Sequence, residues 1–186
     1  MPMTAWHITF GTYGARLHGD DRPTVDRQHN QFGTPYLSPD PERNAGERRE
    51  MASDAVVLSK EQQQYVESVI PGLCEKGKWK YVTCAAGSDH VHTLLQVPSD
   101  VHGKRVRMWL KRWLSQKLNE RWSVAVRSDG MSWFCEGGSN KAVKDDEYFR
   151  NVVNYLNEQR ATPAIKLPIV QEIGANTPRL TSEGIS

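Results

Sequence analysis

Two strand-like segments of the chain are separated by only two residues. Residues 78–86, "KWKYVTCAA", and residues 89–97, "DHVHTLLQV", are rich in β-branched and aromatic side chains. Gly87 and Ser88 between them are suited to a hairpin turn. A connection this short can join only antiparallel strands, because parallel strands need a crossover of a dozen or more residues. The sequence therefore predicts an antiparallel sheet.

The other segments alternate between strand and helix patterns. Residues 5–13, "AWHITFGTY", are typical of a strand, and "MSWFCEGGSN" at residues 131–140 contains a short strand-like piece. Apolar residues recur at helical spacing after Ser59, between residues 103 and 122, and after Asp145. This order predicts an α+β sandwich of ferredoxin-like or RRM-like type, with a mostly antiparallel sheet flanked by helices.

The ends of two of these helices carry local signals. Ser59 followed by Gln62 is typical of a capping box, and Asp145 is suited to the N-cap of the last helix. Pro71 is expected to kink or end the first helix, because proline has no backbone N–H and its ring clashes with the preceding turn.

The length of 186 residues is that of one domain of ordinary size. From about residue 14 to residue 55 no periodicity holds, and proline and glycine recur, which indicates a long loop insertion. Residues 163–186 are expected to form an extended tail. We therefore predict a single domain over residues 1–162.

The composition favours a cytoplasmic protein. Hydrophobic residues make up 38% of the chain and charged residues 25%, and no apolar run approaches the ~20 residues that a membrane span needs. The N-terminus lacks the pattern of a secretory signal. Cys74, Cys84 and Cys135 are widely spaced and form no CxxC pair, which fits a reducing compartment and argues against a zinc ribbon.

Positive charge is concentrated in one predicted helix. The whole chain has a formal net charge of only +2, but residues 104–122 contain seven Lys and Arg residues and a single Glu. Such a local concentration favours an anionic partner. A solvated helix face would explain the same pattern equally well.

His90 and His92 are separated by one residue in a predicted strand. Side chains on a strand alternate between faces, so both imidazoles point the same way and could share one divalent metal ion. A third ligand would have to come from elsewhere in the chain. The alternative is a pair of partly exposed histidines on an edge strand.

The last predicted helix could supply the missing groups. Tyr155 and Gln159 lie one helical turn apart. The Gln159 carbonyl oxygen is a hard ligand suited to Mg²⁺ or Mn²⁺, and the Tyr155 hydroxyl could act as a covalent nucleophile. Tyr148 shares this stripe but has no polar ligand four residues later. The alternative is that Tyr155 is a half-buried aromatic residue with its hydroxyl in water.

These residues carry a family resemblance. His90-Val91-His92 resembles the HUH motif (His, hydrophobic, His) of single-strand DNA nucleases. Residues 6–159 resemble the single-tyrosine HUH transposases, especially the REP-associated tyrosine transposases and their insertion-sequence relatives. The matching pieces, in order, are "WHITFGTYGARLHGD", "DHVH", "GGSNK" and "NYLNEQ".

The resemblance implies a role for each candidate residue. His90, His92 and Gln159 would hold Mg²⁺ or Mn²⁺, and Tyr155 would attack DNA to form a 5′-phosphotyrosine. The substrate would be single-stranded DNA with a hairpin beside the cleavage point. Many members continue with Asn-Pro after the tyrosine, whereas this chain reads "YLNEQRATPAIKLP". The expected contacts to the DNA backbone are Lys104, Arg105, Arg107, Lys111, Arg112 and Lys141.

Three functions are compatible with these residues. The first is a metal-dependent single-stranded DNA endonuclease and strand transferase, active in DNA transposition and recombination as a monomer or homodimer. The second is a non-catalytic nucleic-acid-binding protein on the same scaffold. The third is a metal hydrolase that activates water and uses Tyr155 only structurally. Intact His90, His92, Tyr155 and Gln159 favour the first.

Overall fold

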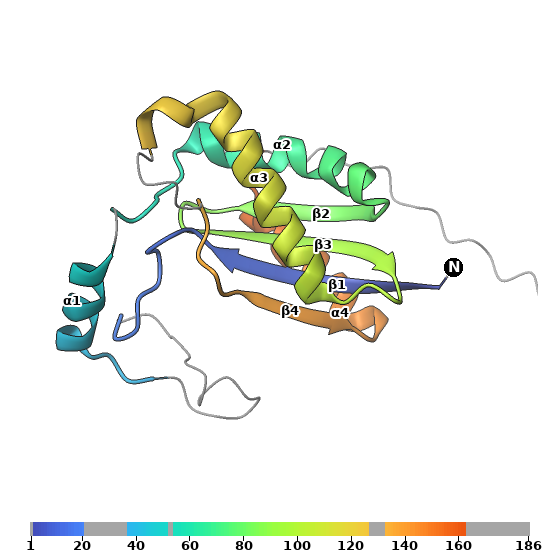
Figure 1. The fold of residues 1–186 in the computed structure, drawn as a ribbon. Coiled ribbons are helices and arrows are strands. Elements are labelled where there is room, and N and C mark those ends of the chain that lie inside the picture. Colours follow the sequence, from blue (N-terminus) through green and yellow to red (C-terminus); the bar gives the residue numbers. More distant parts are fainter. Residues whose placement is uncertain (1, 21–36, 52–53, 127–132, 163–186) are drawn as a thin grey trace, which may run out of the picture.

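A computed structural model describes residues 2–20, 37–51, 54–126 and 133–162 of the chain. Four strands and four helices occur in these ranges (Figure 1). In chain order they are β1 (Met3–Gly11), α1 (Pro41–Glu50), α2 (Lys60–Gly77), β2 (Lys80–Ala86), β3 (His90–Pro98), α3 (Gly103–Val126), β4 (Ser139–Val143) and α4 (Asp146–Gln159).

The four strands form one antiparallel sheet in the order β2-β3-β1-β4. The hairpin β2–β3 is the one that the two-residue connection predicts. β1 lies between β3 and β4, so the first and last strands are neighbours although most of the chain separates them. Together with the helices this is the ferredoxin-like α+β arrangement that the sequence predicts, and that prediction is confirmed.

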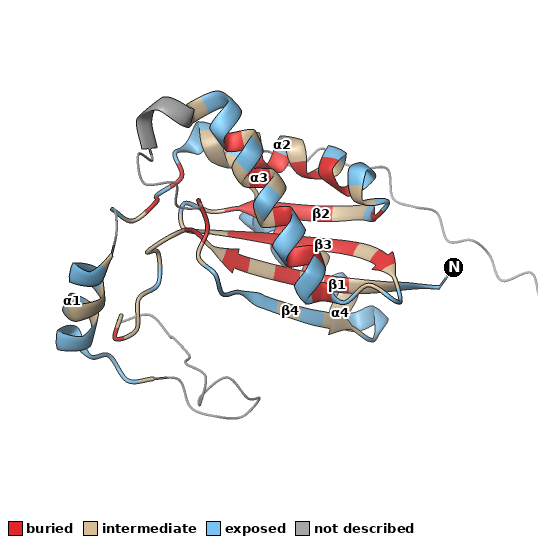
Figure 2. Ribbon diagram, viewed as in Figure 1, coloured by how far each residue is buried: buried red, intermediate tan, exposed pale blue. Residues whose placement is uncertain are grey.

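The helices cover both faces of the sheet, α2 and α3 on one and α4 on the other (Figure 1). The main core lies under α2 and α3 (Figure 2), where alternate residues of β1, namely Trp6, Ile8 and Phe10, are buried. Because side chains alternate along a strand, the residues between them face α4. The second core, under α4, is smaller. Its buried members are Ala85, Leu94, Val152 and Leu156.

The predicted caps are present. Ser59 and Gln62 make both bonds of a capping box at the start of α2, and the Asp145 side chain accepts the Tyr148 N–H at the start of α4. α3 is longer than predicted, and its helical geometry is interrupted at Trp122, where φ is −128°.

Pro71 lies inside α2, which continues to Gly77, so the expectation that this proline could end the helix is wrong. Proline cannot donate to the carbonyl four residues earlier, which belongs to Glu67. In this fold the Glu67 carbonyl has another donor, the Cys84 thiol of β2, at 3.8 Å. Burial raises the pKa of Cys84 to about 11, which keeps the thiol protonated. Packing on the sheet therefore compensates the lost helix bond.

The insertion between residues 14 and 55 contains a helix that periodicity does not reveal. α1 begins after the N-cap Asp40 with Pro41 in its first turn, both favourable starting signals. It buries no side chain (Figure 2), so it has no apolar stripe to recognise in the sequence. Residues 21–36 and 52–53 of the insertion lie outside the described residues.

The last strand lies later in the chain than expected. Trp133 and Phe134 are fully buried, but Phe134 makes only an isolated bridge to Thr12, and β4 begins at Ser139, after the two glycines. The apolar residues here fill the core instead of pairing as a strand. Residues 163–186, the predicted tail, are outside the described residues, and in the part described no helix is long and apolar enough to cross a membrane.

Candidate active site

The two histidines of β3 point toward α4. In the antiparallel register His92 lies opposite Thr9 and His90 opposite Gly11, on the face of β1 that does not enter the main core. The two imidazole ring centroids are 4.7 Å apart. The strand pattern therefore brings His90 and His92 together on one face, as predicted.

Each imidazole is oriented by an oxygen at its Nδ1 atom. His92 Nδ1 lies 2.8 Å from Thr9 Oγ1, and His90 Nδ1 lies 2.5 Å from Asp89 Oδ1. In the tautomer in which Nδ1 carries the proton, both rings donate to these oxygens and keep the lone pair of Nε2 free. Metal-binding histidines are commonly held in this way, by a second hydrogen bond on the opposite nitrogen.

His92 is kept neutral by its surroundings. Burial lowers the pKa of His92 to about 3, and the electrostatic interactions of its ring with His90, His7 and Arg16 act in the same direction. The ring is therefore neutral at physiological pH. A neutral imidazole is the form that binds a metal.

Tyr155 of α4 lies against the histidine pair. Its ring centroid is 5.6 Å from that of His92, and the two rings meet edge to face. The side chain is 44% exposed, so one side contacts His92 and the other is open to solvent. α4 is held over this face by the burial of Val152 and Leu156 against Ala85 and Leu94.

Gln159 is the last residue of α4, one turn after Tyr155, and it is exposed. No contact of its amide with either histidine is among those of the described residues. The described residues also contain no group of three or more His, Cys, Asp or Glu side chains arranged to bind a metal ion. The proposed set differs from such a group because its third ligand is the amide of Gln159.

His7 and Thr9 of β1 belong to the same cluster, and sequence reasoning missed both. His7 Nε2 lies 3.4 Å from His92 Nδ1, and its Nδ1 lies 3.4 Å from the Tyr148 hydroxyl. Burial and the charge of Lys141 lower the pKa of His7. The alternation of β1 could have shown that both residues share a face, but not that this face lies beside β3.

A pocket of about 750 Å³ opens next to His90. It runs from Thr9 and His90 toward the segment after β1 and the segment before β4. Polar and aromatic side chains contribute to its wall, including Tyr13, Arg16 and Asn140. Its size is that of a typical small-ligand site, so it can take a group as large as a nucleotide.

The basic residues predicted to contact DNA do not lie together. α3 covers the face of the sheet opposite the histidines, and on it Lys104, Arg105 and Arg112 are exposed. Lys141 lies on β4 opposite His7, on the histidine face. Of the six predicted cations, Lys141 is therefore the one beside the candidate active site.

Arg107 and Lys111 make contacts within the protein. The Arg107 guanidinium donates to the Gly138 carbonyl and, at 2.8 Å, to Asn140 Oδ1. The Lys111 ammonium donates to the carbonyls of Cys135, Glu136 and Gly137 at 2.6–2.7 Å. Burial lowers the pKa of Lys111 to about 8, which still leaves it mostly protonated at pH 7. The two side chains hold the segment that leads into β4.

These contacts predict different effects for two neighbouring cations of α3. Lys111→Ala should lower the free energy of unfolding by about 1–3 kcal/mol, because three carbonyls lose their donor. It should leave the salt dependence of DNA binding unchanged.

Arg112→Ala, at an exposed position, should leave stability unchanged and reduce the salt slope by about one if α3 contacts phosphates. Denaturant unfolding and DNA titrations at several salt concentrations measure both; equal stability of the two variants would contradict the assignment.

The profile of the IS200-like transposases matches residues 52–159, more than half of the chain. The chain belongs to the IS200-like transposase family. The matched residues include both histidines and Tyr155, and the match ends at Gln159. Family membership makes the protein a transposase, a DNA-processing enzyme, and gives it DNA as a partner.

One solved structure among those similar to this transposase comes from Deinococcus radiodurans R1. It is a crystal structure at 1.90 Å resolution of a protein assigned as a transposase. The two chains are 11% identical, with a TM-score of 0.46, and the alignment covers 87% of this chain and 95% of the other. No curated protein matches this chain.

Proposed function

We propose that this transposase is a single-tyrosine HUH enzyme that cleaves and rejoins single-stranded DNA through a 5′-phosphotyrosine. The observation that carries the proposal is the contact between Tyr155 and the histidine pair, with ring centroids of Tyr155 and His92 5.6 Å apart. Residues of β3 and α4 that are more than sixty positions apart in the chain are in contact here, which supports Tyr155 as a nucleophile beside the proposed metal ligands.

The donor set fits a divalent metal ion. His90 and His92 have their Nδ1 atoms bonded to Asp89 and Thr9, and Nε2 of each is left for a metal. Gln159, exposed one turn after Tyr155, would supply an amide oxygen as the third ligand. When bound there, Mg²⁺ or Mn²⁺ would polarise the scissile phosphate and offset negative charge on its oxygens.

Tyr155 would be the nucleophile. Its oxygen would attack the phosphorus in line as the phenolic proton is lost to water, forming a bond between tyrosine and the 5′-phosphate. The bond from phosphorus to the 3′ oxygen would break, and that oxygen would take up a proton as a free hydroxyl. Since the phosphotyrosine retains the energy of the phosphodiester, a 3′-hydroxyl could later attack it and rejoin strands without ATP.

The surroundings support a single-stranded substrate. The pocket next to His90 can take a nucleotide, and Arg16 on its wall and Lys141 on β4 bring positive charge to the histidine face. Such cations would hold phosphates and contribute affinity instead of sequence choice. A hairpin beside the cleavage point remains part of the proposal, implied by the family resemblance.

The test is a covalent-adduct assay. Labelled single-stranded DNA is incubated with the protein and Mg²⁺ or Mn²⁺, and products are separated on denaturing gels. The proposal expects a labelled protein band and a free 3′-hydroxyl product. Cleavage without an adduct would indicate a metal hydrolase, and binding without cleavage a non-catalytic DNA-binding protein; either result contradicts the proposal.

The hydrogen bond between His92 and Thr9 predicts an effect on metal affinity. Thr9→Val keeps the shape of the side chain but removes the oxygen 2.8 Å from His92 Nδ1. Affinity for Mn²⁺ should fall by about 10–100-fold, as expected when a ligand loses its orienting partner. Calorimetric titration measures the change. Thr4→Val, on the same strand and bonded to Ser99, is the control and should bind Mn²⁺ like the wild type. Equal affinities for the Thr9 and Thr4 variants would show that Thr9 does not orient a ligand.

A further inference from the structure

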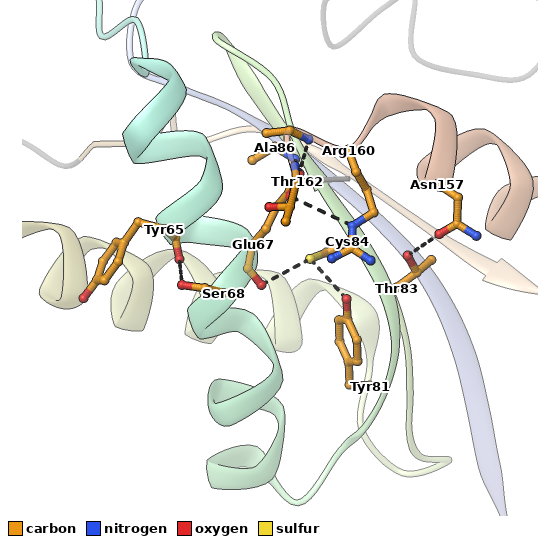
Figure 3. Close-up of polar contacts among 11 residues, drawn as sticks. Tyr65, Glu67, Ser68, Tyr81, Thr83, Cys84, Ala86, Asn157, Arg160 and Thr162 are labelled. Atoms are coloured by element: carbon orange, nitrogen blue, oxygen red, sulfur yellow. Dashed lines mark hydrogen bonds and ion pairs between the residues drawn. The ribbon is translucent and has the colours of Figure 1, made fainter. Parts of the chain in front are cut away.

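A carboxylate is buried on the side of the sheet away from the candidate active site. Glu67 belongs to α2 and is 2% exposed. Its Oε1 accepts the backbone N–H groups of Ala86 at 2.9 Å and Ala161 at 2.7 Å, and its Oε2 accepts that of Thr162 at 2.9 Å. The Arg160 guanidinium is 3.9 Å from Oε2 (Figure 3).

Core packing alone does not explain this carboxylate. Burying an ionised group is costly unless several donors compensate it, and a leucine there would avoid that cost. The donors to Glu67 come from two separate segments, Ala86 at the end of β2 and Ala161 and Thr162 after α4. The contribution of Glu67 therefore lies in joining these two segments.

Both segments lead directly to the candidate active site. Ala86 of β2 pairs with Val91, the residue between the two histidines of β3. Ala161 and Thr162 follow α4 immediately, two and three residues after Gln159. Glu67 thus links the hairpin that carries the histidines to the end of the helix that carries the tyrosine.

The other contacts of α4 define its position less strictly. The small apolar cluster beneath the helix is non-directional, so by itself it would allow α4 to slide or rotate by a fraction of a turn. Two polar side-chain contacts also connect the helix to the sheet. Thr83 Oγ1 of β2 donates to Asn157 Oδ1 at 3.1 Å (Figure 3), and the Tyr148 hydroxyl lies 3.4 Å from His7 Nδ1 of β1. The bonds from Ala161 and Thr162 to Glu67 hold the C-terminal end of α4. Gln159 lies at this end, so a small shift of the helix end would displace it.

We propose that Glu67 is a positioning residue that sets the place of α4 relative to β3, and so the geometry of Tyr155 and Gln159 against the histidines. The expected effect of Glu67 on activity rests on the proposed function. The inference assigns a role to a residue of α2 that would contact neither DNA nor metal.

The first test removes one donor and leaves the buried carboxylate in place. Thr162→Pro lacks the N–H that Glu67 Oε2 accepts, whereas Thr162→Ala keeps it, and the Thr162 side chain is not part of the link. In single-turnover assays Thr162→Pro should slow adduct formation about 10–100-fold, because a small displacement of a reacting group has effects of that order. It should raise the Mn²⁺ concentration for half-maximal rate and leave DNA affinity unchanged. Thr162→Ala should match the wild type.

A second test changes the acceptor and controls for stability. Glu67→Gln replaces one carboxylate oxygen with an amide nitrogen, which cannot accept an N–H. Val66→Ala, at the neighbouring buried position of α2, destabilises the main core without touching the link. Well below both melting temperatures, Glu67→Gln should reproduce the slow adduct formation and weaker Mn²⁺ response of Thr162→Pro. Val66→Ala should not.

Hydrogen exchange separates this inference from the proposed function. Amides of α4 should exchange faster in Glu67→Gln than in Val66→Ala, whether or not the protein cleaves DNA. If the wild type forms an adduct but Glu67→Gln and Thr162→Pro match its rate and Mn²⁺ response, the positioning role is overturned. If the wild type forms no adduct, the proposed function fails, and equal α4 exchange in the two α2 variants would overturn the link as well.

Discussion

Tyr155→Phe is expected to abolish the covalent protein–DNA adduct, with a loss of at least about 1,000-fold in cleavage. The substitution removes only the hydroxyl oxygen and keeps the ring that contacts His92, so the fold and the histidine pair should be retained. Without that oxygen no bond to phosphorus can form at this position. The measurement is the adduct yield on denaturing gels, with single-stranded DNA binding measured in parallel and expected to remain close to that of the wild type.

Tyr148→Phe is the matched control. Tyr148 lies on the same helix near the same cluster, with its hydroxyl 3.4 Å from His7 Nδ1. Burial and the nearby Asp145 raise the pKa of Tyr148, which makes its phenolate harder to form. The control should therefore keep most of the adduct. An adduct that persists in Tyr155→Phe and disappears in Tyr148→Phe would transfer the nucleophile to Tyr148.

His92→Ala should have the second large effect, a loss of about 1,000-fold or more in cleavage, with much of the DNA binding retained. His92 is the more buried of the two histidines, and its neutral imidazole is the form that binds a metal. Removing it leaves at most two of the three proposed ligands. EDTA should abolish cleavage by the wild type, and added Mn²⁺ should restore it there but not in His92→Ala.

His102→Ala controls for the loss of a histidine elsewhere. His102 is exposed just before α3 and packs against Trp6, on the other face of the sheet. The His102→Ala variant should cleave DNA like the wild type. Because His92→Ala leaves a cavity, its melting temperature must be measured and the assays run well below it. Full activity in a folded His92→Ala protein would rule out the proposed metal site, and a loss of DNA binding would mean that the metal also organises the DNA.

Much of the fold can be predicted from local patterns. The hairpin, the capping box at Ser59 and the N-cap at Asp145 are specified by neighbouring residues, and the structure has all of them. Pro71 and α1 are different. α2 continues through Pro71, where a thiol from a distant strand donates to the freed carbonyl, and α1 has no buried face that could mark it in the sequence. Neither outcome is encoded within a window of a few residues.

The cations of α3 illustrate the same limit. The sequence shows that the basic residues of α3 are charged and lie off its apolar stripe. By charge and position on the helix alone, Arg107 and Lys111 cannot be distinguished from Arg112. Only the approach of the segment before β4 gives Arg107 and Lys111 carbonyl acceptors and leaves Arg112 exposed.

The sequence by itself determined that His90 and His92 share one face of a strand and that Tyr155 and Gln159 share one side of a helix. Both follow from the local periods of strand and helix. Only the tertiary structure decided that α4 packs on the histidine face, that His7 and Thr9 come from a neighbouring strand, and that Glu67 joins the two parts. These depend on strand order and on contacts between residues far apart in the chain, which no local period encodes.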